Sequence, residues 1–525
     1  MSVGQDGRED EAVREAVHCL SRRHLRADDA VLMVDASAEG RAWLSARYPG
    51  LPLRAVSPQT LHEAILQRHG DVLRCEAVEG LGRRLPELSA RRVLTPRQAL
   101  VLSLVGLALA MGLLLRPLGL LHGAVLLLSA AFVASGLFRA FLAWLGAGAS
   151  ARALPLPSRG LPRYTILVPM YREAAVLPGL VQALKQLDYP AALLDIKLVL
   201  EADDAETIAA AQRLQDGSFE IVRVPDHGPR TKPKAANYAL QFARGEFLVI
   251  YDAEDRPESD QLLKAVAAFR AGPRTLACVQ ARLNFYNADH NWLTRMFALD
   301  YALWFDMLLP GLDRIGMPMP LGGTSNHFRN AVLRDNGGWD AFNVTEDADI
   351  GIRLAQLGYG VSMIDSTTYE EAPVALGAWL RQRSRWLKGY MQTWLVHMRD
   401  PLRLLRRAGL GGFCAFQLFI GGGIVFALAN PLLWVVFLAS LLLGWQAPGD
   451  FGHVPGASLL ANNLLLTYLA MISPGRRGRA DLAPYGLTVI VYWAMVSLAG
   501  YRALAQLVTR PFYWEKTTHG VTPQA

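Results

Sequence analysis

The sequence has few of the residues that stabilise secreted domains or bind clustered metals. Its four cysteines, Cys19, Cys75, Cys278 and Cys414, are scattered through 525 residues without disulfide or metal-ligand spacing. They therefore predict reduced packing residues. The first thirty residues carry charges throughout, so we expect no cleavable signal peptide. We find no nucleic-acid-binding motif, internal repeat or low-complexity tract, and we exclude nucleic acid from the expected partners.

Long apolar runs, in contrast, are abundant. Hydrophobic residues make up 52% of the chain, and basic residues, which bring the net charge to +7, bunch beside the apolar runs. The runs at 99–115 and about 123–138 are each close to the length that a helix needs to cross a bilayer. Arginines flank the pair on both sides and place both flanks in the cytoplasm by the positive-inside rule. We predict a transmembrane hairpin over residues 96–146.

Three further apolar runs lie at residues 410–444, 457–472 and 487–507. The first is too long for one pass and contains Asn430 and Pro431, which predicts either two passes or a broken helix. With two passes the chain has about six spans, and Arg476, Arg477 and Arg479 fall outside the cell. With one pass the C-terminus falls outside instead. We favour two passes, with residues 409–508 as transmembrane helices and 509–525 as a cytosolic tail.

The N-terminal region, residues 1–95, is soluble in character. It contains a strand-like run at 30–34 and a helical run at 60–68 that follows Ser57 and Pro58, so we predict a small cytosolic α/β domain. No motif in it indicates chemistry. It is either a structural appendage or a regulatory or docking module.

Between the two sets of apolar runs, residues 155–400 alternate between strand-like and helical stretches. The strand-like runs lie at 164–168, 196–200, 220–224, 247–250 and 276–279. This βαβ pattern predicts an α/β fold with a mainly parallel sheet. Ligands of such sheets gather beyond the carboxyl ends of the strands. Three strand ends carry acids there, in the stretches 169–173, 201–204 and 252–255.

The central stretch is 247–255, an apolar strand that ends in Asp252, Glu254 and Asp255. Carboxylates so close together repel one another unless a cation neutralises them. Ligand sets made of oxygen suit a hard ion, so the pattern favours Mg²⁺ or Mn²⁺. The alternative is a polar loop that starts the next helix, because Pro257 follows.

Five motifs in order resemble the inverting family-2 membrane glycosyltransferases, the group of cellulose, chitin and hyaluronan synthases. Glu201, Asp203 and Asp204 resemble the segment that binds the nucleotide base, although a glutamate replaces the usual first aspartate. Lys232 and Asn237 resemble a Lys-x-x-x-x-Asn segment beside the nucleotide. The other three motifs are Asp252-Ala-Glu254 for Asp-x-Asp, Thr345-Glu346-Asp347 for the catalytic base, and Gln382-Arg-Ser-Arg385-Trp386 for Gln-x-x-Arg-Trp.

The resemblance implies a GT-A-like nucleotide-sugar-binding domain inserted between transmembrane helices, and a nucleotide diphosphate sugar, expected to be a UDP-sugar, as donor. The donor-binding residues that it implies, together with the adjacent strand ends, are Pro169, Tyr171, Glu173, Glu201, Asp203, Asp204, Lys232, Asn237, Asp252, Gln382, Arg385 and Trp386. The expected metal ligands are Asp252 with Glu254 or Asp255. A bound metal would stabilise the departing diphosphate as a Lewis acid, and Lys232 and Arg385 would add fixed positive charge.

Asp347 is the candidate general base for the acceptor hydroxyl, with Glu346 beside it. Like charges so close tend to raise the pKa of one carboxyl group, which suits a base. The alternative is a helix start, with Thr345 as its cap and the acids at the positive end of the helix dipole. The two interpretations are compatible.

Two other segments resemble parts of these synthases. Gly323, Thr324 and Ser325, with Trp386, resemble an acceptor-facing loop; the alternative is an ordinary turn. Near the C-terminus the candidate gating residues are Trp514, Lys516, Thr517 and His519. The alternative for this second segment is a tail that snorkels at the membrane interface.

Together these features predict a multi-pass protein of the plasma (inner) membrane with a cytosolic catalytic domain. We expect it to elongate an extracellular polysaccharide. The alternatives are transfer of a single sugar to a lipid carrier, and a non-catalytic receptor or scaffold that retains the fold. The expected partners are the nucleotide sugar, a growing glycan or lipid acceptor, membrane lipids and export subunits.

Overall fold

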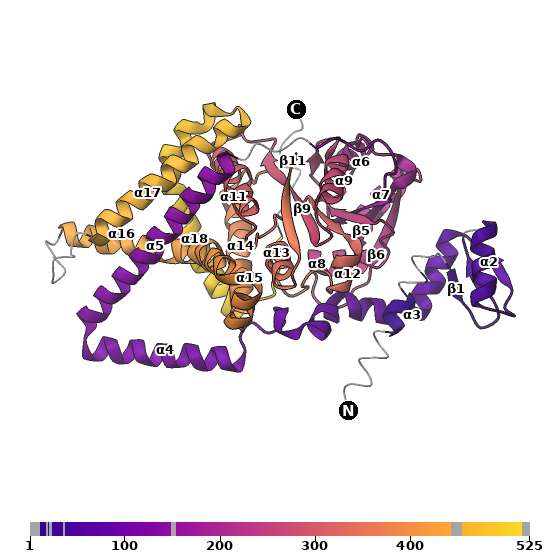
Figure 1. Cartoon of the computed structure of the whole chain (residues 1–525), viewed down its shortest axis with the longest axis horizontal. Coiled ribbons are helices and arrows are strands. Elements are labelled where there is room, and N and C mark those ends of the chain that lie inside the picture. Colours follow the sequence, from indigo (N-terminus) through magenta and orange to yellow (C-terminus); the bar gives the residue numbers. More distant parts are fainter. Residues whose placement is uncertain are drawn as a thin grey trace.

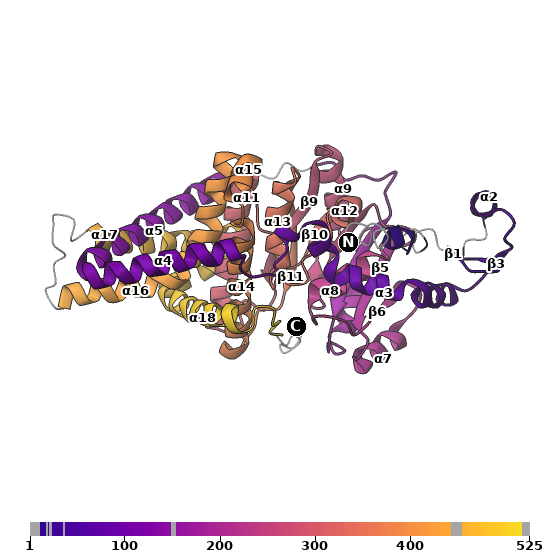
Figure 2. The ribbon, with the colours of Figure 1, turned by 90° about the horizontal axis from the view of Figure 1, so that it is seen from below.

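The computed structural model describes residues 11–16, 19, 24–34, 37–148, 154–442 and 454–516. Three regions follow one another along the long axis of the molecule (Figure 1). A small N-terminal region lies at one end, an α/β domain lies in the middle, and long apolar helices lie at the other end. Figure 2 shows the same order from a perpendicular direction.

The N-terminal region has a three-stranded sheet in the order β1 (His24–Arg26), β2 (Val31–Met33) and β3 (Leu53–Ala55). Helix α2 (Ala38–Arg47) joins β2 to β3, and α3 (Pro58–Arg84) leads to the α/β domain. The predicted strand at 30–34 and helix at 60–68 are both present. The helix extends sixteen residues beyond its predicted end because its second half packs against the α/β domain, where Leu73 and Ala77 are buried.

The α/β domain is built on an eight-stranded sheet in the order β6-β5-β4-β7-β10-β9-β11-β8. Its strands are β4 (Tyr164–Met170), β5 (Leu194–Glu201), β6 (Phe219–Val224), β7 (Phe247–Ile250), β8 (Arg256–Pro257), β9 (Leu276–Phe285), β10 (Asn326–Arg329) and β11 (Gly360–Glu370). Strands β4 to β7 are parallel, as the βαβ pattern predicts. The short strand β10 is antiparallel to both of its neighbours, β7 and β9.

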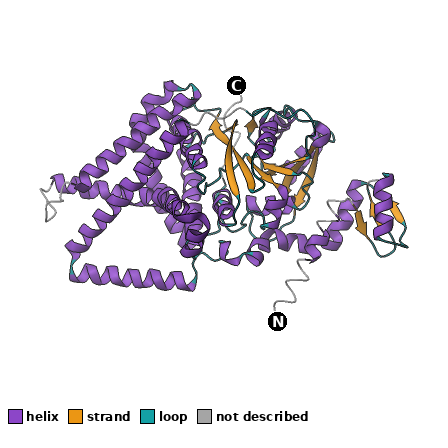
Figure 3. Ribbon diagram, in the orientation of Figure 1, coloured by secondary structure: helices purple, strands orange, loops and turns teal. Residues whose placement is uncertain are grey.

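Helices cover both faces of this sheet (Figure 3). One face packs against α6 (Leu177–Lys185), α7 (Ala205–Leu214) and α9 (Gln261–Ala271). The other packs against α8 (Lys232–Leu240), α12 (Asn330–Asp335), α13 (Glu346–Gln356) and part of α3. Because β4, β5 and β7 are parallel neighbours, their carboxyl ends meet at one edge of the sheet.

Between the sheet and the apolar helices lie α10 (Trp292–Leu303), a π-helical turn at 304–308, α11 (Leu309–Arg314) and α14 (Leu376–His397). In the part of the chain that the structure describes, five helical segments are long and apolar enough to cross a membrane. The first two, α4 (Pro96–Leu115) and α5 (Pro117–Ala147), cover the residues of the predicted hairpin. Helix α5 is longer than predicted because its second half packs on α11 and on the π-helical turn.

The predicted two passes within residues 410–444 are wrong. Helix α15 (Pro401–Phe416), a π-helical turn at 417–421 and α16 (Gly422–Leu442) follow without a reversal of direction. The helical path is kinked at Gly409, whose φ is 71°. Pro431 lies inside α16 without ending it, as neighbouring helices allow in apolar segments. Residues 410–442 are therefore one helical rod.

The prediction that the arginines at 476–479 lie across the membrane from the α/β domain is also wrong. Helix α17 (Val454–Ile472) returns to that domain, where Arg477 pairs with Asp306 at 2.8 Å and Arg479 with Asp289 at 2.7 Å. Helix α18 (Val489–Thr509) then lies along α14 and contacts the domain at both ends. Of the residues after α18, Arg510 and Tyr513 thus lie against Lys388 of α14 through their carbonyl groups.

Candidate active site

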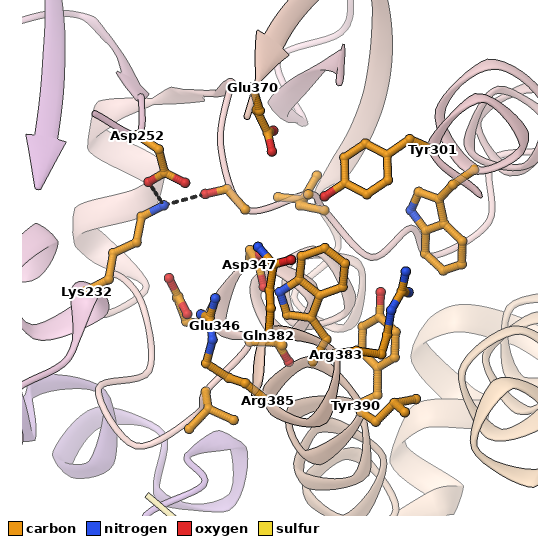
Figure 4. Close-up of a pocket in the computed structure, with 18 of the residues that line it drawn as sticks. Lys232, Asp252, Tyr301, Glu346, Asp347, Glu370, Gln382, Arg383, Arg385 and Tyr390 are labelled. Carbon is orange, nitrogen blue, oxygen red and sulfur yellow. Dashed lines mark hydrogen bonds and ion pairs between the residues drawn. The ribbon is translucent and has the colours of Figure 1, made fainter. Parts of the chain in front are cut away.

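A cavity of about 480 Å³ opens where the carboxyl ends of β4, β5 and β7 face α13 and α14. Figure 4 shows labelled side chains of its lining, which come from these and neighbouring elements and surround one space. Of the predicted donor-binding residues, those that line it are Pro169, Tyr171, Glu173, Glu201, Lys232, Asp252, Gln382, Arg385 and Trp386. The predicted base Asp347 and its neighbour Glu346 also line it. Side chains more than 170 residues apart in the sequence therefore meet in one cavity.

Lys232 and Asp252 form an ion pair at the strand end of this cavity. Lys232 is the first residue of α8, and Thr231 caps that helix. The Lys232 ammonium also donates a hydrogen bond to the Gly323 carbonyl at 2.7 Å. Burial alone would lower the pKa of Lys232, but the carboxylates of Asp252 and Glu346 outweigh burial and raise it. Lys232 is thus a permanent cation.

Acids gather around this pair. Asp252, Glu254 and Glu370 line the cavity. Burial, followed by the charges of Asp255 and Asp252, raises the pKa of Glu370 well above its usual range. Asp255 does not line the cavity: it is buried, and its Oδ2 accepts hydrogen bonds from the Asp252 amide at 2.8 Å and from the Thr324 hydroxyl. Asp255 therefore orients the loop, and Glu254 is the better candidate for the second metal ligand.

Glu346 and Asp347 are the first two residues of α13. The Ala348 amide donates to Asp347 Oδ1 at 2.7 Å, which fixes this carboxylate at the start of the helix. Burial raises the pKa of Asp347. Burial and the charge of Asp347 together raise the pKa of Glu346 to about 8. Both carboxyl groups therefore bind a proton more tightly than exposed acids do.

Helix α14 supplies Gln382, Arg385 and Trp386 to the opposite wall. The Arg385 guanidinium lies over the Trp514 ring, 4.3 Å from its centroid. Lys516, from the same C-terminal segment, pairs with Glu173 at 3.4 Å. Two of the four predicted gating residues therefore lie at the cavity, whereas Thr517 and His519 fall outside the described residues.

Three predicted donor-binding residues lie outside the cavity lining. The Asn237 side chain donates to the carbonyls of Ala77 and Trp339 and accepts from the Trp339 amide at 2.8 Å. Asp204 caps α7 and accepts from the Arg172 amide. Asp203 pairs with Arg230 at 3.0 Å. These side chains hold neighbouring segments in place, which a motif match does not reveal.

Of Gly323, Thr324 and Ser325 in the predicted acceptor loop, Gly323 lines the cavity and the other two do not. A Cβ at this glycine would lie 3.3 Å from Asp347 Oδ2, so the bare backbone permits close approach. Thr324 is buried, and its hydroxyl oxygen lies 3.1 Å from the Ile250 carbonyl oxygen. Ser325 is also buried, has a φ of 57° and donates to Thr368 at 2.7 Å. Thr324 and Ser325 support the loop and do not face an acceptor.

Residues 247–448 match the model of glycosyl transferase family group 2. This range contains Asp252, Asp347 and all of α14. The chain contains a family-2 glycosyltransferase domain. The structure gives this domain the α/β fold with a mostly parallel sheet that the sequence predicts.

The curated relatives of this family-2 domain are glycosyltransferases. A probable glycosyltransferase YdaM of Bacillus subtilis is 25% identical over 251 residues, which span 47% of this chain and 60% of the relative. A beta-monoglucosyldiacylglycerol synthase of Trichormus variabilis is 28% identical over 68% of this chain and 77% of its own length. A probable glucomannan 4-beta-mannosyltransferase 6 of Oryza sativa is 29% identical over 43% and 41%.

Among solved structures, mannosyltransferase PcManGT from Pyrobaculum calidifontis is similar to this chain. The identity is 23%, the match covers 70% of this chain and 96% of that chain, and the TM-score is 0.46.

Sequence reasoning missed part of the site in the family-2 domain. Glu370 ends a strand that the sequence pattern did not predict, and Arg383 occupies a variable position of the Gln-x-x-Arg-Trp motif. Other missed residues come from the apolar helices and the elements beside them: Arg139, Tyr301, Trp304, Tyr390, Phe419, Phe426, Leu466, Trp493 and Val496. A basic residue inside an otherwise apolar run, as at Arg139, is the one signal that could have found them.

The donor set fits a hard divalent cation that shares its coordination with a phosphate. No group of three or more acids, histidines or cysteines among the described residues is arranged to hold a metal alone. Magnesium, however, usually binds one or two carboxylates together with substrate phosphates. Asp252 and Glu254 provide such carboxylates beside the cations Lys232 and Arg385.

Proposed function

We propose that this protein transfers a sugar from a nucleotide diphosphate sugar to an acceptor at the membrane, with inversion at the anomeric carbon and with Mg²⁺ or Mn²⁺. One observation carries the proposal: a permanent cation, a pair of candidate metal ligands and a candidate base line the same cavity of a family-2 domain. The base and the ligands come from separate elements, as a displacement between two substrates requires.

The donor diphosphate would bind at the strand end of the cavity. Asp252 and Glu254 would hold the metal, which stabilises the negative charge of the leaving diphosphate. Lys232 and Arg385 add fixed positive charge from two sides. Arginine presents a planar fork that matches phosphate oxygens, and stacking on Trp514 fixes the plane of Arg385.

The acceptor hydroxyl would lie beside Asp347. Its oxygen attacks the anomeric carbon as Asp347 takes the proton, and the bond from that carbon to the diphosphate breaks. A single displacement of this kind inverts the anomeric centre. The bare backbone of Gly323 leaves room for the acceptor next to Asp347.

The membrane position follows from the apolar helices and from the basic residues on the domain's side. Arg477 and Arg479 contact the α/β domain, so by the positive-inside rule this domain faces the cytosol of a plasma (inner) membrane. Elongation of a polysaccharide, a UDP-sugar as donor, export subunits and kinship with the cellulose, chitin and hyaluronan synthases stay predictions from the sequence.

The test is donor turnover by the purified full chain with a panel of UDP- and GDP-sugars. We expect turnover that a chelator abolishes and that Asp252→Asn lowers by about a hundredfold or more. Asp216→Asn is the matched control, because this exposed acid pairs with Lys185 outside the cavity. Full turnover by Asp252→Asn would contradict the proposal, and failure of the wild type to bind any donor would favour the non-catalytic scaffold.

A further inference from the structure

The cavity continues past the acids and ends among the apolar helices. Its lining beyond the acids comes from α10, the π-helical turns and α5, α16, α17 and α18. We call the following residues the membrane end of the cavity: Arg139, Phe419, Gly423, Phe426, Leu466, Trp493 and Val496. The family-2 chemistry at the donor end does not use this part of the cavity.

The membrane end is apolar except for one cation. A glycan in this space would place its hydroxyl groups against phenylalanine, leucine and valine side chains. A hydroxyl group buried without a hydrogen-bond partner costs about 1–3 kcal/mol in proteins. A hydrocarbon chain has no hydrogen bonds to lose there, and it gains dispersion contacts. The lining therefore favours an alkyl chain over a sugar chain.

Arg139 is the exception. It lies in α5 with its guanidinium over the Phe419 ring, 5.4 Å from the centroid. Among the described residues no carboxylate lies within ion-pair distance of it. Charged side chains inside apolar helices are costly and mark functional sites. A cation at this depth suits the oxygen atoms that join a lipid's polar end to its chains.

A ring of polar and aromatic residues joins the two ends. Figure 4 shows Tyr301, Arg383 and Tyr390 on the far side of Asp347 and Gln382 from Lys232. Arg383 donates hydrogen bonds to Asp300 and to the Tyr492 hydroxyl, both at 2.6 Å, which hold its guanidinium in this wall. A molecule that passes the ring can place a polar end beside Asp347 and an apolar body among α5, α16, α17 and α18.

We propose that the acceptor is a membrane lipid with a free hydroxyl group, such as a diacylglycerol, whose acyl chains occupy the membrane end. The inference rests on the proposed function and specifies its acceptor. The lipid oxygen forms the new bond to the anomeric carbon, and its proton passes to Asp347. The broken bond leaves its electron pair on the diphosphate. A general base is needed only if the attacking group of the acceptor carries an O–H proton. This requirement favours a lipid alcohol over a lipid phosphate.

The full chain, reconstituted in vesicles with a labelled donor, tests this proposal. The acceptor probes are dioleoylglycerol, a polyprenyl phosphate and a soluble oligosaccharide. We expect a lipid glycoside from dioleoylglycerol at a rate at least tenfold above the other two. Glycosylation confined to the oligosaccharide or to the polyprenyl phosphate would overturn the proposal.

Matched variants of α18 test the position of the lipid. Val496 lines the membrane end, whereas Leu498 faces outward with 59% of its surface exposed. We expect Val496→Trp to lower transfer to dioleoylglycerol at least tenfold with less than a threefold change in donor affinity. Leu498→Trp should leave both unchanged. Equal transfer by the two variants would overturn the proposed position of the lipid.

Failure of this inference differs from failure of the proposed function. A wild-type protein that hydrolyses the donor to free sugar but glycosylates none of the lipids overturns only the acceptor. A wild-type protein that neither binds nor hydrolyses any donor overturns the function itself.

Discussion

The two ends of the cavity are lined by different kinds of side chains from different kinds of elements. At the donor end, charged side chains come from the carboxyl ends of parallel strands and from the starts of α8 and α13. Ion pairs or hydrogen bonds that involve the backbone fix Lys232, Asp252 and Asp347. At the membrane end, apolar side chains come from the faces of long helices. The difference indicates that the chemical step and the choice of acceptor are separable. A substitution at the donor end should lower transfer to every acceptor, including hydrolysis by water. A substitution at the membrane end should lower transfer to the lipid only.

The largest expected effect is at the proposed base. Asp347→Asn keeps the shape of the side chain but removes the proton acceptor, so we expect the rate of transfer to fall about 10²–10⁴-fold. Donor affinity, measured by calorimetry, should change little. A rate within tenfold of the wild type would mean that another group takes the proton, and would end the assignment of Asp347.

The next effect is at the diphosphate. Arg385→Lys keeps the charge but loses the planar fork and the stack on Trp514. A hydrogen bond to a charged group contributes about 1.5–3 kcal/mol, so we expect donor turnover to fall about 10–150-fold. Hydrolysis and lipid transfer should fall together. A loss confined to lipid transfer would contradict the division between the two ends.

The smallest effect is at Glu346. With a pKa of about 8, Glu346 is protonated at pH 7, so Glu346→Gln should stay within about threefold of the wild-type rate at that pH. Above pH 8 Glu346 of the wild type gains a negative charge beside Asp347 and the diphosphate, and the wild-type rate should fall. The variant should show no such fall. A similar fall in the rates of both proteins above pH 8 would show that ionisation of Glu346 does not cause it.

The donor end could be predicted because its charged residues lie in short sequence motifs. Lys232, Asp252, Asp347 and Arg385 all lie at the cavity, as their motifs indicate. The same motifs also contain residues with structural roles. Asn237 joins α3 to the loop at Trp339, and only the packed structure reveals that its side-chain NH₂ group already donates to two backbone carbonyls.

The membrane end could not be predicted. An apolar residue in a long helix gives the same signal whether it faces lipid, another helix or a cavity, so Phe426 and Val496 could not be distinguished from their neighbours. The path of the apolar helices could not be predicted from the sequence either. The apolar pattern of 487–507 predicts a span, yet both ends of α18 contact the α/β domain. Long-range packing against α14, which hydropathy does not encode, decides its position.

The most direct test of the central claim is a structure of the full chain with Mn²⁺ and a non-hydrolysable nucleotide sugar, obtained by cryo-electron microscopy. We predict that the diphosphate lies between Asp252, Lys232 and Arg385, with the anomeric carbon facing Asp347. A diphosphate bound elsewhere, or a sugar that points away from Asp347, would contradict the account.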